Sequence, residues 1–67
     1  MPRIIIQSLE GRSLEQKREL VRRMTLDVVD VYRVTPDQVT VFIEEASPEN
    51  FAKGGVLEAD KRAGVAS

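Results

Sequence analysis

The sequence contains neither cysteine nor histidine, and these two absences restrict the chemistry that the chain can perform. Without cysteine, the chain has no disulfide framework and no thiolate ligand for a metal. Without histidine, no side chain has an unperturbed pKa close to 7, where a general base works best. If the protein uses a general base, that base is a group other than the usual side chains.

Strong charge of one sign and long apolar runs are absent as well. The 10 basic and 11 acidic residues are interspersed and give a net charge of −1, so no basic footprint predicts nucleic-acid binding. The longest apolar run has three residues, which excludes a membrane-spanning segment, and no signal peptide is visible. We therefore expect a cytoplasmic protein whose residues 1–67 form one small domain, near the lower size limit for a self-sufficient core.

The chain starts with Met1 and Pro2, and the proline has two interpretations. Proline is tolerated at the first residue of a strand, where its missing N–H removes no hydrogen bond from the sheet. Alternatively, a small second residue allows removal of Met1, which leaves Pro2 with a free secondary amine. An α-amino group has a pKa of about 7.7–8.0, and apolar surroundings and a nearby cation lower that pKa further. Such an amine is the nearest available candidate for a general base.

The first half of the chain predicts one strand followed by one long helix. Ile4, Ile5 and Ile6 are consecutive within a strand over Arg3–Leu9, so its centre is expected to be buried on both faces. Ser13 and Gln16 form a capping box that begins a helix over Leu14–Tyr32. The expected core stripe of this helix consists of Leu20, Val21, Met24, Val28, Val31 and Tyr32. The charged residues on its other side are those of a solvated face: Lys17, Arg18, Arg22, Arg23 and Asp27.

The second half predicts a short turn at Thr35–Gln38, a strand over Val39–Glu45 and a hairpin over Phe51–Leu57, with residues 58–67 as a peripheral tail. The fold class is α/β (α+β): a small β-α-β subunit with two parallel strands, one long helix and a short C-terminal hairpin. One helix covers only one face of two strands. Because side chains on the second face also need burial, we expect self-association and a site formed between chains.

Several of these residues together resemble the 4-oxalocrotonate tautomerase family. They are Pro2, the run Leu9-Glu10-Gly11-Arg12-Ser13, the run Glu15-Gln16-Lys17, the Val39–Glu45 strand, and Phe51 with Gly54-Gly55; the resemblance covers residues 2 to about 57. It implies a homohexamer or trimer of dimers that uses no cofactor or metal. It also implies keto–enol tautomerisation of unsaturated 2-oxo acids and a role in the degradation of aromatic compounds.

The resemblance assigns roles to five positions. Pro2 matches the amine that acts as general base once methionine is lost. Arg12 matches an arginine that binds a substrate carboxylate, Phe51 and Leu9 match positions that line the substrate pocket, and Thr40 occupies the position of a second arginine. From the residues alone, the favoured interpretation of Arg12 is a surface residue before a helix, and core packing of Phe51 is compatible with its pocket role.

The threonine at position 40 departs from the family pattern. Its hydroxyl offers a hydrogen bond but no charge to a developing enolate, which affects the expected substrate more than the reaction class. Arg3, next to Pro2, is a cation that could partly substitute, but a solvent-facing strand end is the favoured interpretation of it. Leu9 and Lys53 stand where hydrating dehalogenases of the family carry an arginine and a carboxylate, so hydration is disfavoured. The alternative functions are a small oligomeric scaffold or binding protein without turnover, or a family member with different proline-based chemistry.

Overall fold

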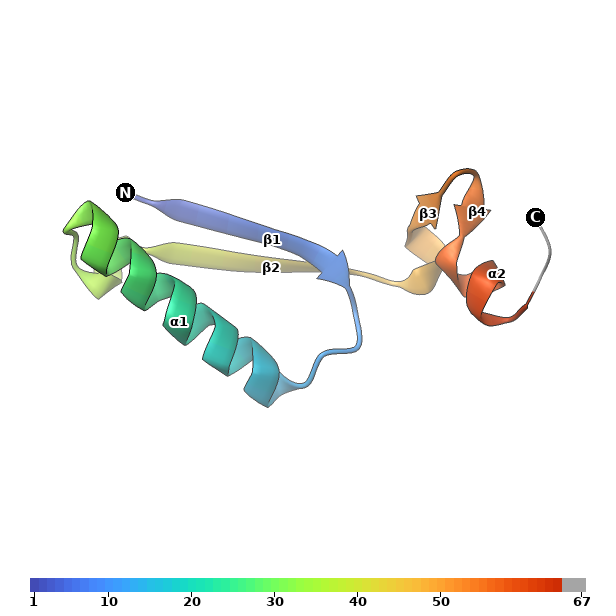
Figure 1. Ribbon diagram of the computed structural model, residues 1–67, viewed down its shortest axis with the longest axis horizontal. Coiled ribbons are helices and arrows are strands. Elements are labelled where there is room, and N and C mark those ends of the chain that lie inside the picture. Colours follow the sequence, from blue (N-terminus) through green and yellow to red (C-terminus); the bar gives the residue numbers. More distant parts are fainter. Residues whose placement is uncertain (65–67) are drawn as a thin grey trace.

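The structure, a computed structural model that describes residues 1–64, has a strand, a long helix and a second strand in that order. Strand β1 spans Arg3–Leu9, helix α1 spans Leu14–Tyr32 and strand β2 spans Thr40–Ala46. The two strands are adjacent and parallel, and α1 makes the crossover between them (Figure 1). The predicted β-α-β subunit is therefore confirmed, with β1 and α1 at the predicted residues.

The start of α1 is fixed by the predicted capping box. The Ser13 Oγ accepts a hydrogen bond from the Gln16 backbone N–H at 3.1 Å, and the Gln16 Oε1 accepts one from the Ser13 N–H at 2.9 Å. These two bonds satisfy donors that the first turn of a helix otherwise leaves free. The helix ends at Arg33, whose left-handed conformation (φ 58°) breaks the helical path.

Strand β2 begins and ends one residue later than predicted, because two backbone hydrogen bonds set its limits. The Val39 N–H donates to the Pro36 carbonyl at 3.1 Å, so it closes the 3₁₀ turn η1 (Pro36–Gln38) and is not available to the sheet. At the other end, the Glu10 N–H donates to the Ala46 carbonyl at 2.9 Å. Pairing between the two strands therefore continues to Ala46.

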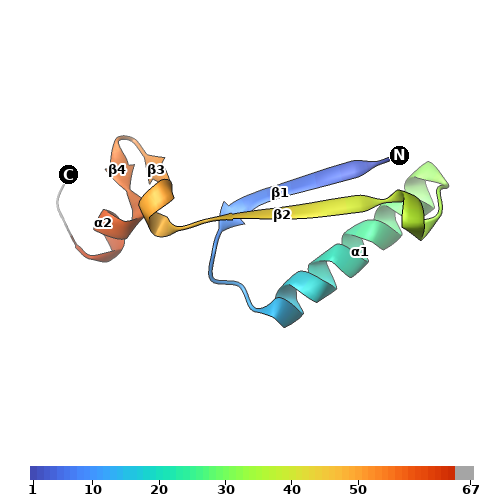
Figure 2. The same cartoon turned by 180° about the vertical axis from the view of Figure 1, so that it is seen from behind.

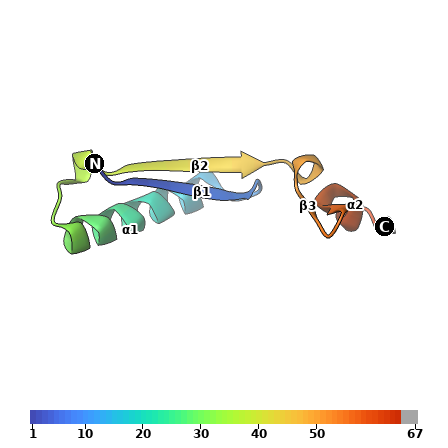
Figure 3. The same ribbon diagram turned by 90° about the horizontal axis from the view of Figure 1, so that it is seen from above.

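The strand register divides the side chains between two unlike faces. Residues such as Ile4 and Ile6 are half-buried beneath α1, whereas Ile5 and Phe42 point to the opposite face and are 51% and 42% exposed. Figure 3 shows α1 on one side of the strands and no element on the other. Burial on both faces of β1 was expected, and within one chain this is wrong for Ile5, because no element of the described part of the chain covers the second face.

Helix α1 is also only partly covered. Val21, Met24 and Val28 of the expected core stripe are half-buried, but Val31 is 71% exposed and Tyr32 is similarly open. Two strands about 5 Å apart form a sheet that is narrower than the apolar stripe of the helix. The prediction of a core stripe is therefore wrong within a single chain for Leu20, which is 41% exposed, and for Val31 and Tyr32.

The C-terminal residues form a small unit beyond the ends of β1 and β2 (Figures 1 and 2). It consists of the 3₁₀ turn η2 (Pro48–Asn50), strands β3 (Ala52–Lys53) and β4 (Val56–Leu57), and helix α2 (Glu58–Arg62). Gly54 and Gly55 have φ angles of 63° and 85° and make the turn of the predicted hairpin, which is confirmed. The expected tail starts with α2 rather than with irregular chain, and its residues 65–67 lie outside the described residues.

No side chain among residues 1–64 is fully buried. The radius of gyration is 16.0 Å, whereas a compact chain of this length has one of about 11 Å. The accessible surface is 5448 Å², roughly 1,200 Å² more than a folded monomer of this mass exposes. One chain therefore leaves apolar surface that a monomeric domain would bury. Among the described helices, none is long and apolar enough to cross a membrane.

Candidate active site

Pro2 is held at the N-terminal end of the sheet, directly before β1. Its carbonyl accepts a hydrogen bond from the Thr40 N–H at 3.0 Å, which fixes the residue against β2. Its half-buried ring lines a surface depression beside the last turns of α1. The other residues that line this depression are Arg3, Ile4, Asp27, Val28, Val31 and Tyr32. Pro2 thus lies in largely apolar surroundings that contain one carboxylate and one guanidinium.

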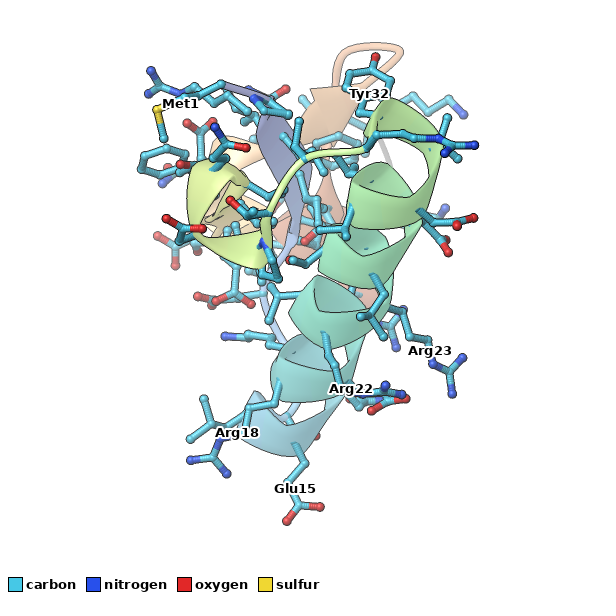
Figure 4. All side chains as sticks on the ribbon, turned by 90° about the vertical axis from the view of Figure 1, so that its left-hand side faces the viewer. Met1, Glu15, Arg18, Arg22, Arg23 and Tyr32 are labelled. Atoms are coloured by element: carbon cyan, nitrogen blue, oxygen red, sulfur yellow. The ribbon has the colours of Figure 1, made fainter. Side chains whose placement is uncertain are left out.

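Figure 4 views the same end of the molecule and labels Met1 and Tyr32. Met1 is 87% exposed and projects beyond the strand. Its removal would leave the packing of the sheet unchanged and would convert the Pro2 nitrogen from an amide to an amine. An amide nitrogen is not basic, so the chemistry available at Pro2 depends on this one cleavage.

Thr40 lies at the same end of the sheet as Pro2. It is the first residue of β2, it pairs in register with Arg3, and its exposed side chain is on the face opposite α1. The structure therefore brings Pro2 and Thr40 together through the backbone. The Thr40 hydroxyl can donate a hydrogen bond to an oxyanion, but it cannot supply a charge.

Leu9 and Phe51 lie together at the opposite, C-terminal end of the strands. Both line a second depression, whose remaining lining residues are Gln7, Ser8, Glu44, Glu45 and Ala46. Phe51 follows η2, and its carbonyl accepts a hydrogen bond from the Glu58 N–H at 2.8 Å, which ties it to α2. The two predicted pocket residues are thus neighbours, and together they offer an apolar wall.

Arg12 is in the connection between β1 and α1, after Gly11, whose φ of 128° turns the chain. It lines a third depression with Lys17 and Glu45 among others. Lys17 forms an ion pair with Glu45, so that carboxylate is already engaged. Arg12 itself makes no ion pair with any residue in the described range 1–64. Its guanidinium is available for an external anion.

The predicted site residues form two groups that one chain does not bring together. Pro2 and Thr40 are at the start of the strands, whereas Leu9, Phe51 and Arg12 are at their end. The seven residues of β1 separate the groups, a distance of about 23 Å at the rise of an extended strand. No small substrate can contact Pro2 and Arg12 of the same chain at once.

The charged outer face of α1 is paired within itself. Arg22 and Arg23 both donate hydrogen bonds to the Glu19 carboxylate, at 2.6 to 3.0 Å, and these bonds lower the pKa of Glu19 to about 2. Arg18, Arg22 and Arg23 project away from the strands (Figure 4). This arrangement agrees with a solvated face for the three arginines, whereas the same prediction is wrong for Lys17, which is half-buried and pairs with Glu45 of β2. Within residues 1–64, no group of three or more acidic side chains is placed to hold a metal ion.

Two features near Pro2 escaped the sequence reasoning. Asp27, which the helical pattern placed on the solvated face, lines the Pro2 depression. The guanidinium of Arg3 lies over the ring of Phe42, with its Cζ atom 4.6 Å from the ring centroid. The position of Asp27 could have been predicted from topology, because the last turns of a crossover helix lie near the start of the first strand.

The chain is similar in sequence and in fold to known tautomerases. A family profile described as "Tautomerase enzyme" matches residues 2–61. The chain is 38% identical over 55 residues to the 2-hydroxymuconate tautomerase of Bacillus subtilis (strain 168), a match that covers 82% of this chain and 89% of that protein. A structure from work on the 4-oxalocrotonate tautomerase isozymes of Methylibium petroleiphilum matches with a TM-score of 0.85 at 41% identity, and covers 96% of this chain and 100% of that one. A heterohexamer 4-oxalocrotonate tautomerase from Chloroflexus aurantiacus J-10-fl matches with a TM-score of 0.79 at 35% identity, over 90% and 97% of the two chains.

Proposed function

Because the chain belongs to the tautomerase enzyme family, we propose that it catalyses keto–enol tautomerisation of unsaturated 2-oxo or 2-hydroxy carboxylic acids. The observation that carries this proposal is the placement of Pro2, the residue at which the family match begins. Pro2 is anchored to β2, and its ring lies beside apolar residues of α1. Such surroundings disfavour the protonated form of an amine and lower its pKa toward neutrality.

The reaction needs one group that takes a proton and returns it elsewhere. With Met1 removed, the neutral Pro2 amine accepts a proton from the acidic carbon or hydroxyl of the substrate, which becomes an enolate. The resulting ammonium group then gives the same proton to a carbon further along the conjugated system. No atom is gained or lost, and the amine is regenerated, so a single base is sufficient.

The complete site is formed between chains, and the free edge of β1 supports this arrangement. Among residues 1–64, β1 pairs only with β2, so its outer edge carries unpaired backbone groups that can pair with a second copy. Two β1 strands that pair antiparallel around a twofold axis between Ile5 and Ile6 place Pro2 opposite Leu9 of the second chain. Because Phe51 lines the same depression as Leu9, it reaches the Pro2 region together with it.

In this arrangement Arg12 of the second chain follows its Leu9 and supplies a cation beside the amine. The planar fork of a guanidinium suits bidentate binding of a carboxylate. The apolar wall formed by Leu9 and Phe51 excludes water and helps to keep the Pro2 amine neutral. Six chains, as in the heterohexameric relative, would bury the open sheet faces as well; we propose a homohexamer.

Replacing Arg12 by alanine tests its proposed role. We expect Arg12→Ala to raise KM for carboxylate substrates by about tenfold to a hundredfold, because the substrate loses a charged hydrogen bond in the ground state. The change in kcat should be smaller. Steady-state kinetics with 2-hydroxymuconate measures this. Arg18→Ala is the matched control, because Arg18 is an arginine on the first turns of α1 that projects away from the strands and lies outside the proposed site. An unchanged KM in a correctly assembled Arg12→Ala protein would make Arg12 a surface residue only.

Position 40 offers a gain-of-function test. Because Thr40 supplies no charge to the developing enolate, the natural protein should be a slow, permissive tautomerase on dicarboxylate dienols. We expect Thr40→Arg to raise kcat/KM for 2-hydroxymuconate by roughly a hundredfold, since one oxyanion donor contributes on the order of 2–4 kcal/mol. Phenylpyruvate, a monoacid, should change less. A natural protein that already works near the diffusional limit would contradict this interpretation of Thr40.

A further inference from the structure

An ion pair between Lys17 and Glu45 joins the start of α1 to the end of β2. The Lys17 Nζ lies 2.5 Å from the Glu45 Oε1, and the two side chains are only 29% and 24% exposed, less than those of the ion pairs on the outer face of α1. Glu45 follows the half-buried Ile43 by two residues, so its side chain is on the sheet face that α1 covers. A carboxylate in such a place needs a cationic partner, and Lys17 supplies it.

Arg12 lines the same depression as this ion pair. Ser8, which is opposite Glu45 in the strand register, lines it as well. The Lys17 backbone N–H donates to the Ser13 carbonyl at 3.1 Å, so Arg12 directly precedes the helical turn that carries Lys17. Among residues 1–64, Glu45 is the only acidic residue that lines the depression. Two cations and one carboxylate therefore share it.

Without Lys17, the Glu45 carboxylate would be the nearest partner for Arg12. A guanidinium can bind a carboxylate through two parallel hydrogen bonds, a geometry that an ammonium group cannot match. The Arg12 side chain is long and exposed, and it lines the same depression as that carboxylate. Lys17, by contrast, is fixed by α1 on the side that contacts β2. Because Lys17 occupies Glu45, the excess positive charge of the depression stays on Arg12.

We propose that Lys17 is a positioning residue: it holds the Glu45 carboxylate and thereby keeps the Arg12 guanidinium free to bind a substrate carboxylate. This inference rests on the proposed function for the role of Arg12. Lys17 contacts no substrate in this account and acts only through Glu45. Removing Lys17 should therefore weaken anion binding, whereas removing Lys17 and Glu45 together should not.

Calorimetric titration with hexanoate, a carboxylate without a keto group that cannot be turned over, tests this difference. Lys17→Met keeps an apolar stem and removes the charge, so Glu45 should capture Arg12 and hexanoate affinity should fall by about tenfold. The double variant Lys17→Met/Glu45→Gln removes the competing carboxylate as well, and it should regain most of the affinity. Lys17→Arg keeps a cation on Glu45 and should bind hexanoate like the natural protein.

Two controls separate this role from a general loss of charge or stability. In an Arg12→Ala background, Lys17→Met should cause no further loss of hexanoate affinity, because no guanidinium is left to be captured. Arg22→Met is the matched substitution, since it also breaks an ion pair of α1, but on the outer face of the helix. It should bind hexanoate like the natural protein. Sedimentation checks that each variant assembles.

Three results would overturn the inference. The first is a natural protein that shows no measurable hexanoate binding, or a Lys17→Met variant that binds as tightly as the natural protein. The second is a double variant that binds as weakly as Lys17→Met, and the third is dissociation of both variants. Either of these last two would make the ion pair a structural anchor between α1 and β2.

Turnover of 2-hydroxymuconate is measured separately, so that the two proposals can fail independently. Activity that does not need Pro2 would refute the proposed function, while the loss and recovery of hexanoate affinity would leave this inference standing. Activity that needs Pro2, in a protein whose hexanoate affinity is insensitive to Lys17, would refute only this inference.

Discussion

Blocking the Pro2 amine is expected to lower the ketonisation rate of 2-hydroxymuconate by at least about a hundredfold, the usual contribution of a positioned general base. A variant that retains Met1 blocks the nitrogen as an amide and leaves every side chain in place. The chain has no histidine or cysteine that could take over the role of the base. The measurement is kcat/KM for protein of verified intact mass, with and without Met1.

Pro2→Ala supplies a second test of the same amine. It keeps a primary amine at the terminus, so a residual rate above that of the Met1-retaining form is allowed. It also loses the rigid ring that lies beside Val28 and Val31. Sedimentation and circular dichroism should be unchanged in both variants, because Met1 is exposed and Pro2 contributes only its carbonyl to the sheet. Full activity in both forms would end the proposal of a proline base.

Placing a charge on the open sheet face is expected to prevent assembly and, with it, folding. Ile5 is 51% exposed in one chain, but in the proposed hexamer it is covered by other copies. A lysine there would bury an unpaired charge in every chain, at a cost of several kcal/mol per site. We therefore expect Ile5→Lys to sediment at the 7.5 kDa mass of one chain and to lose its helical circular dichroism signal, because a single chain has no buried core.

Leu26→Lys is a matched control for this substitution. Leu26 is 50% exposed, almost the same as Ile5, but it lies on α1 at a helical position turned away from the half-buried Val28 and Met24. We expect this variant to assemble at about six times the mass of one chain and to keep its helix. Equal behaviour of the two variants, whether both assemble or both unfold, would show that the open face has no special role in association.

Local sequence signals were sufficient to predict most of the subunit. Ser13 and Gln16 specify the start of α1 by two hydrogen bonds that involve only neighbouring residues. The alternation of polar and apolar residues specifies β2 to within one residue. The remaining error arose at Val39, whose N–H is taken by the Pro36 carbonyl. That choice between a turn and a sheet depends on geometry that no pattern of side chains encodes.

The candidate site was less predictable, because its parts are distributed over separate elements. The sequence marks Pro2 and Arg12 as unusual residues, and the predicted strand Arg3–Leu9 already separates them; which residues of other chains complete each end is not encoded in any local pattern. The stacking of Arg3 on Phe42 depends on the register of two strands that are far apart in sequence. Exposure of Val31 could not be foreseen from periodicity, which identifies the apolar stripe of a helix but not the width of its partner.

The most direct test of a proline base is titration of the Pro2 nitrogen itself. In protein labelled with ¹⁵N-proline, the Pro2 resonance should titrate with a lower pKa than an ordinary α-amino group, whose pKa is about 7.7–8.0. The same pKa should appear as the acidic limb of the pH profile of kcat/KM, since only the free amine removes a proton. A Pro2 nitrogen that does not titrate in active protein, or a pKa unrelated to the rate profile, would contradict the account.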